Sequence, residues 1–89
     1  MGHRIELSEI DRALDAVDEV ERAMCTFEKN KIIAYYVGQI EKKDLAAKLA
    51  ERIPKYMLPN RYVPMSSLPL TKNGKIDRKA LMEGRHDAH

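Results

Sequence analysis

A chain of 89 residues has room for one small domain and argues against a large enclosed substrate pocket. Apolar residues make up 44%, which favours a folded core, and the net charge of +2 is too mild to indicate a nucleic-acid partner by itself. The single cysteine, Cys25, excludes an internal disulfide, and no apolar run approaches the roughly 20 residues of a membrane span. These features favour a cytoplasmic protein without a membrane partner.

The first part of the chain predicts a helix followed by two strands. Residues 6–20 carry apolar side chains at helical spacing, namely Ile10, Ala13, Leu14 and Val17. Ser8, with Asp11 three residues later, resembles a capping box at the start of this helix. Residues 20–27 and 31–38 are rich in strand-forming residues, and the short polar "EKN" between them predicts an antiparallel pair.

The second part predicts a helix, an edge strand and a last short helix. Residues 42–53 place apolar side chains on one helix face, namely Leu45, Ala46, Leu49, Ala50 and Ile53. Pro64, in the strand candidate 61–65, indicates a sheet edge or a bulge, and Asp77 can cap a helix over residues 78–83. This order of elements predicts an α+β fold, a small sheet of about three strands with helices packed on it.

The two ends of the chain suggest different things. Residues 4–7 alternate polar and apolar side chains, as in the second half of a hairpin whose first strand would lie upstream. We therefore expect the chain to be a piece of a longer polypeptide. Residues 1–82 are assigned to the folded domain, and residues 83–89, "EGRHDAH", are expected to be a tail or linker.

The common catalytic and metal-binding residue sets are absent from the sequence. Cys25 lies among apolar residues, which is typical of a buried structural thiol. His3, His86 and His89 lack the spacing of metal ligands, so no metal site is predicted. The chain also has no glycine loop of the Walker type.

The stretch "LTKNGKI" is the one that could carry chemistry. Asn73-Gly74 favours positive φ at both residues, as in a type I′ turn, and Gly74 leaves the backbone open to a ligand. Such a turn would hold Lys75 outward, which suits a site where negative charge accumulates, such as a carboxylate attacking a phosphate. The alternative interpretation is that Lys75 is a solvated charge beside a common turn.

Three stretches together resemble motifs of the adenylate-forming enzymes, in matching order and spacing: "GHRIELSEID", "IPKYMLP" and "LPLTKNGKIDRKAL". The resemblance covers nearly the whole chain. It is strongest to the small C-terminal subdomain of amino-acid adenylation domains, from nonribosomal peptide synthetases or D-alanine–carrier-protein ligases. The resemblance implies an ATP-dependent acid–thiol ligase in which a carboxylate attacks the α-phosphate of Mg-ATP. The acyl group then passes to the phosphopantetheine thiol of a carrier protein.

The resemblance assigns the first step to the lysine-bearing stretch. Lys75 would enter the active site and bridge the substrate carboxylate and a phosphate oxygen, while Asn73 and Gly74 would shape its turn. ATP, Mg and the amino-acid substrate would be held mainly by a large N-terminal subdomain that this chain lacks. The resemblance therefore implies that the chain alone is catalytically inert.

The resemblance assigns the second step to the first motif. The subdomain would act as a mobile lid that rotates between the steps and then presents Gly2, His3 and Arg4 to the active site. Gly2 would let the pantetheine arm pass. Arg4 would meet a phosphate of the thiol partner or, in a structural role, pair with Glu6 or Glu9.

Other residues of the motifs have structural interpretations. Asp77 and Arg78 are expected to be a helix cap and a member of a surface pair, and Tyr56 and Pro59 are expected to order the loop between helix and strand.

Two further functions stay open. A small basic nucleic-acid-binding module would use the cations of the last motif, Lys72, Lys75, Arg78 and Lys79, although no aromatic platform interleaves with them. An interaction module that only docks a carrier protein would need no catalytic lysine. The sequence does not name the amino acid or separate a peptide synthetase from a D-alanine ligase, because the selecting pocket would lie in the large subdomain.

Overall fold

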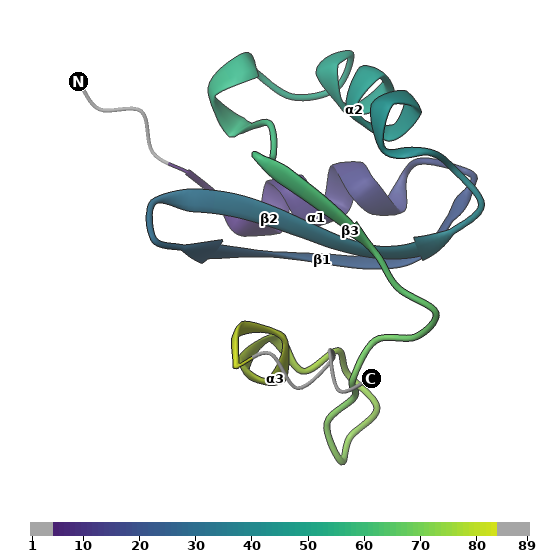
Figure 1. Ribbon diagram of the computed structural model, residues 1–89, viewed down its shortest axis with the longest axis vertical. Coiled ribbons are helices and arrows are strands. Elements are labelled where there is room, and N and C mark those ends of the chain that lie inside the picture. The colour runs from purple at the N-terminus through teal and green to yellow at the C-terminus, as the bar shows by residue number, and fades with distance from the viewer. Residues whose placement is uncertain (1–4, 84–89) are drawn as a thin grey trace.

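The computed structural model describes residues 5–83. They form a three-stranded sheet with helices on both faces (Figure 1). The α-helices are α1 (Leu7–Asp15), α2 (Lys42–Ala50) and α3 (Arg78–Met82), and a 3-10 helix, η1, covers Lys55–Met57. The strands are β1 (Val20–Glu28), β2 (Lys31–Gly38) and β3 (Arg61–Pro64). The predicted α+β fold and the predicted order of its elements are confirmed.

The central strand of the sheet is β2, which runs antiparallel to β1 and parallel to β3. The parallel pair requires a crossover, and α2 with η1 supplies it. β3 therefore lies at the sheet edge, as Pro64 indicated. Lys29 and Asn30 form the connection between β1 and β2, with φ of 50° and 65°, which is the two-residue turn typical of tight hairpins.

The sheet separates two apolar cores of different size. The core under α1 and α2 is the larger, and its best-buried side chains are Ile10, Leu14, Tyr36, Leu45 and Leu49. The opposite face of the sheet is covered by α3 and the segment before it, which lie below the strands in Figure 1. Its buried side chains are Ile33, Tyr35, Leu68 and Leu81. The smaller core thus connects the C-terminal part of the described chain to the sheet by apolar contact.

Two local predictions for α1 are wrong. The helix begins at Leu7 with Glu6 as N-cap and no side-chain cap bond, so Ser8 and Asp11 form no capping box. Asp11 instead accepts hydrogen bonds from β1 and α3. The helix also ends at Asp15 rather than near residue 20, because Val20 is already paired with the last residue of β2.

The other helix and the N-terminal alternation also differ from the prediction. α2 ends at Ala50, whose side chain is exposed, so the helix stops short of Ile53. Ile53 itself is partly buried and packs against the larger core, as predicted. Ile5 and Glu6 belong to no strand among residues 5–83, and Leu7 is helical. The alternating pattern at residues 4–7 is therefore not a strand over its described part.

Candidate functional site at the Lys75 hairpin

The segment that carries Lys75 is a small hairpin at the opposite end of the structure from α2 (Figure 1). The Thr71 N–H donates to the Lys75 carbonyl at 2.7 Å, and the Gly74 N–H donates to the Thr71 carbonyl at 2.9 Å. Leu70 and Ile76 form an antiparallel bridge at its base. We call residues 69–76 the Lys75 hairpin. Its backbone is closed by these bonds before any ligand binds.

The turn of this hairpin differs from the predicted type I′ geometry. Gly74 has a φ of 84°, but Asn73 has no positive φ. The Thr71 hydroxyl accepts hydrogen bonds from the N–H groups of Asn73 at 3.3 Å and Lys75 at 3.2 Å. The bonds to the Thr71 hydroxyl, together with the bond from the Gly74 N–H to the Thr71 carbonyl, are typical of a turn followed by a left-handed glycine. Glycine is needed at position 74 for its φ, since a Cβ there would meet nothing within 4 Å.

Lys75 is presented to solvent by this turn. Its side chain is exposed, and within residues 5–83 no ion pair or side-chain hydrogen bond occupies its ammonium group. Lys72 on the same hairpin is also exposed. The geometry thus places a cation with three donors on a closed turn, where an anion from outside the chain can reach it.

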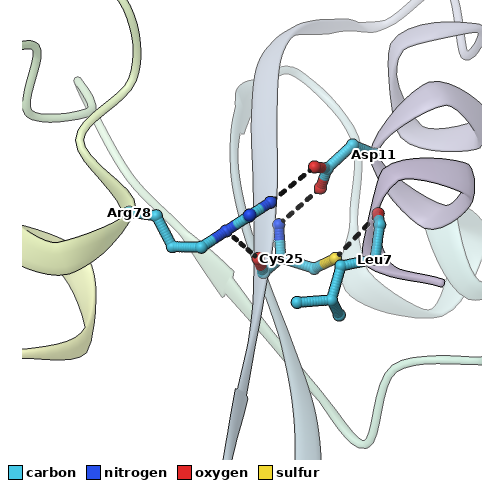
Figure 2. A network of polar contacts seen from close by, with 4 residues as sticks. All are labelled: Leu7, Asp11, Cys25 and Arg78. Atoms are coloured by element: carbon cyan, nitrogen blue, oxygen red, sulfur yellow. Dashed lines mark hydrogen bonds and ion pairs between the residues drawn. The ribbon is translucent and has the colours of Figure 1, made fainter. Parts of the chain in front are cut away.

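The base of the hairpin continues directly into α3. The Asp77 N–H donates to the Pro69 carbonyl at 2.8 Å, and the Asp77 carboxylate accepts from the Ala80 N–H at 3.0 Å. The predicted helix cap is therefore confirmed. Arg78 is not the simple surface pair that was predicted, because it contacts both Asp11 on α1 and the Cys25 carbonyl on β1 (Figure 2).

Cys25 is the buried structural thiol that the sequence predicted. Its side chain is fully buried, and its Sγ donates to the Leu7 carbonyl at 3.5 Å. Burial, with Asp11 close by, raises the pKa of the Cys25 thiol far above its ordinary range. The thiol therefore stays protonated and is a poor nucleophile and metal ligand.

Several predicted features lie elsewhere or outside the described chain. Gly2, His3 and Arg4 fall outside residues 5–83, as do His86 and His89. Tyr56 lies in η1 and is partly exposed, while Pro59 is buried before β3. The described residues hold no group of three or more side chains suited to a metal ion. No described helix has the length and apolar character needed to cross a bilayer.

A surface hollow of about 930 Å³ lies between the end of β2 and α2. Its lining includes Glu19, Ile40, Lys43 and Lys48 but no residue of the Lys75 hairpin. The hollow therefore cannot bring a bound molecule to Lys75.

Solved structures of adenylate-forming enzymes share this fold. NpsA from Klebsiella oxytoca, solved with 3-hydroxyanthranilyl-AMSN, is 32% identical with a TM-score of 0.87, over 94% of this chain and 18% of that one. Holo-AB3403, a four-domain nonribosomal peptide synthetase bound to AMP and glycine, is 36% identical with a TM-score of 0.74, over 89% of this chain and 6% of that one. The architecture thus defines a subdomain of an adenylate-forming enzyme.

The family is shown by sequence as well. The model of the AMP-binding enzyme C-terminal domain matches residues 9–75, and the chain belongs to this family. Gramicidin S synthase 2 from Brevibacillus brevis is 40% identical over 92% of this chain. The chain spans only 2% of the length of that relative. The family resemblance drawn from the three motifs is confirmed.

Proposed function

We propose that this chain is the C-terminal lid of an amino-acid adenylation enzyme and that Lys75 is its catalytic lysine for adenylate formation. The observation that supports the proposal most directly is the hairpin, whose backbone is closed by its own hydrogen bonds and whose exposed lysine ammonium has no partner among residues 5–83. Family membership and the similarity to a peptide synthetase solved with AMP and glycine agree with this role.

The chemistry of the first step calls for a cation at this point. An oxygen of the amino-acid carboxylate attacks the α-phosphorus of ATP, and pyrophosphate leaves with the electrons of the broken P–O bond. Both reactants are anions, so negative charge is concentrated where they meet. The Lys75 ammonium would donate to a carboxylate oxygen and a phosphate oxygen at once, and so lower the energy of the transition state more than that of the separated reactants.

The described residues fit only part of the implied cofactor set. Lys75, exposed on its hairpin, can meet a phosphate oxygen. Residues 5–83 hold no carboxylate cluster that suits Mg²⁺. When bound, Mg²⁺ would neutralise charge on the phosphates. The metal, the nucleotide base and the amino acid would therefore be held by a large N-terminal subdomain, and the isolated chain would be inert.

The second step depends on rotation of the same body. We propose that residues 1–82 turn as one lid and that residues 83–89 act as a tail or linker. In the second pose, Gly2, His3 and Arg4 would face the active site while the acyl group passes to the phosphopantetheine thiol of a carrier protein. The reduced Cys25 in its buried site agrees with a cytoplasmic enzyme.

The test is amino-acid-dependent ATP–pyrophosphate exchange in the intact enzyme, with Lys75→Ala compared with wild type. Loss of one preorganised donor to developing charge typically costs about 100- to 1,000-fold in kcat, and we expect a loss of this size. Lys72→Ala is the matched control, because it removes the same charge from the same hairpin, and its loss should be much smaller.

Thioester transfer from preformed adenylate separates the two steps. Lys75→Ala should retain this transfer, because the lysine leaves the active site when the lid rotates. Unchanged exchange in Lys75→Ala would refute the catalytic role and leave the chain with a docking role toward the carrier protein.

A further inference from the structure

A closed hydrogen-bond network joins α3 to α1 around the edge of the sheet (Figure 2). Arg78 Nη2 donates to Asp11 Oδ2 at 2.7 Å, and Arg78 Nε donates to the Cys25 carbonyl at 3.1 Å. The Cys25 N–H donates to Asp11 Oδ1 at 2.8 Å. We call these three residues the Arg78 clasp. All three bonds are partly buried, because Cys25 is fully buried and the Arg78 and Asp11 side chains are only partly exposed.

The clasp occupies a position where backbone groups would otherwise lack partners. β1 is an edge strand, and the outward N–H and carbonyl of Cys25 are both bonded to side chains rather than to another strand. Arg78 and Asp11 are 67 residues apart in the sequence. The guanidinium is planar, and its two donors have a fixed angle between them, so these bonds specify direction as well as proximity.

The same helix carries the Lys75 hairpin. Lys75 is three residues before Arg78, and between them Asp77 both bonds the hairpin base and caps α3. Hydrogen bonds therefore join the hairpin and α3 into one unit. Apart from the clasp, this unit is held on the sheet mainly by the smaller core, through Leu68, Ile76 and Leu81. Apolar contact is not directional, so it keeps α3 on the sheet without fixing its angle.

We propose that Arg78, held by Asp11, is a positioning residue for Lys75 in adenylate formation. The clasp sets the orientation of α3 on β1, and the hairpin transmits that orientation to the ammonium. The inference rests on the proposed catalytic role of Lys75. It concerns the first step alone, because that is the step in which Lys75 would contact the reacting groups.

The proposal predicts a specific kinetic pattern in the intact enzyme. A displacement of about 1 Å in a catalytic group can cost up to about 100-fold, so Arg78→Ala should lower the kcat of ATP–pyrophosphate exchange about 10- to 100-fold. The KM values for ATP and the amino acid should change little, and thioester transfer from preformed adenylate should be retained. A residue that served stability alone would lower both steps together, in proportion to the folded fraction.

The decisive measurement is a double-mutant cycle of Lys75→Ala and Arg78→Ala. If Arg78 acts through Lys75, the double variant should have the exchange rate of Lys75→Ala alone. If the two losses multiply, Arg78 acts by another route and the proposal is wrong. If Lys75→Ala leaves exchange unchanged, the proposed function itself fails. If Lys75→Ala loses exchange and Arg78→Ala does not, only the positioning role of Arg78 fails.

Milder variants keep the test valid if Arg78→Ala does not fold. Arg78→Lys retains the charge but cannot make both bonds in the same geometry, and Asp11→Asn keeps one oxygen acceptor while losing the ion pair. Both should give smaller losses of exchange than Arg78→Ala, with transfer retained. Arg22→Ala is the matched control, because it removes an exposed arginine from β1, the strand that contributes Cys25 to the clasp. Full exchange activity in both milder variants would overturn the proposal.

Discussion

Leu49 gives the sharpest test of the larger core. Its side chain is 0% exposed, on the face of α2 that is buried in the larger core. Leu49→Ala removes three carbon atoms from this closed environment, and comparable changes cost about 2.7–5.0 kcal/mol, the transfer term plus a cavity term. A chain of this length has a total stability of about 4–13 kcal/mol, so the variant should lose a large part of it.

Urea unfolding followed by circular dichroism measures the effect. For a loss of about 3 kcal/mol and a slope of about 1.5 kcal/mol per molar, the midpoint should fall by about 2 M. Leu70→Ala is the matched control, because Leu70 is 47% exposed on the Lys75 hairpin and the chemical change is identical. The control should lose less than about 1 kcal/mol. Equal midpoints for the two variants would refute the assignment of Leu49 to the core.

Three further predictions concern the sheet. The double variant Lys29→Asn, Asn30→Gly should raise Tm by about 4–8 °C. The left-handed backbone costs a lysine about 1 kcal/mol or more, and asparagine and glycine largely avoid this cost. An unchanged or lower Tm would contradict the observed turn. Gly38→Ala should cost about 1–3 kcal/mol, since its Cβ would collide with the Glu19 carbonyl oxygen, and wild-type stability would contradict that packing. Burial raises the pKa of Tyr62 to about 12 from 10.0, so between these values the folded chain keeps a proton that the unfolded chain has lost. Stability should thus fall as pH rises through this window, and less steeply in Tyr62→Phe, which urea midpoints across the window would show.

The elements that the sequence predicts well are those specified by local chemistry. β2 begins and ends where its run of strand formers does, and Asp77 caps α3 because the capping bond spans only three residues. Pro64 located the edge strand for a similar reason, since a missing donor is a property of one residue.

The two turns show where local reasoning stops. Asn73-Gly74 suggested a type I′ turn, but the Thr71 hydroxyl stabilises a longer loop in which only the glycine is left-handed. The two-residue left-handed turn lies instead at Lys29-Asn30, although lysine disfavours positive φ. There the pairing of two long strands fixes the loop length, and the turn residues adopt the geometry that remains.

The Arg78 clasp could not be predicted from the sequence, because its residues are far apart in the chain. Asp11 sits at the expected place for a capping role, and nothing within a few residues of it indicates a partner on α3. Only the fold brings α1, the edge of β1 and α3 together. Within the candidate site, the hairpin could therefore be predicted and its support could not.

The unequal cores explain why such a support would matter. α1 and α2 share the larger core, where many buried side chains fix their packing, whereas α3 rests on the smaller one with five helical residues. A short helix on few apolar contacts can shift its angle at little cost, because those contacts are not directional. A lysine required to meet a transition state cannot tolerate that freedom. If Lys75 has the proposed role, the two charge-assisted bonds of Arg78 to β1 and α1 would remove this freedom without enlarging the core, and they would leave the hairpin surface open to the reactants.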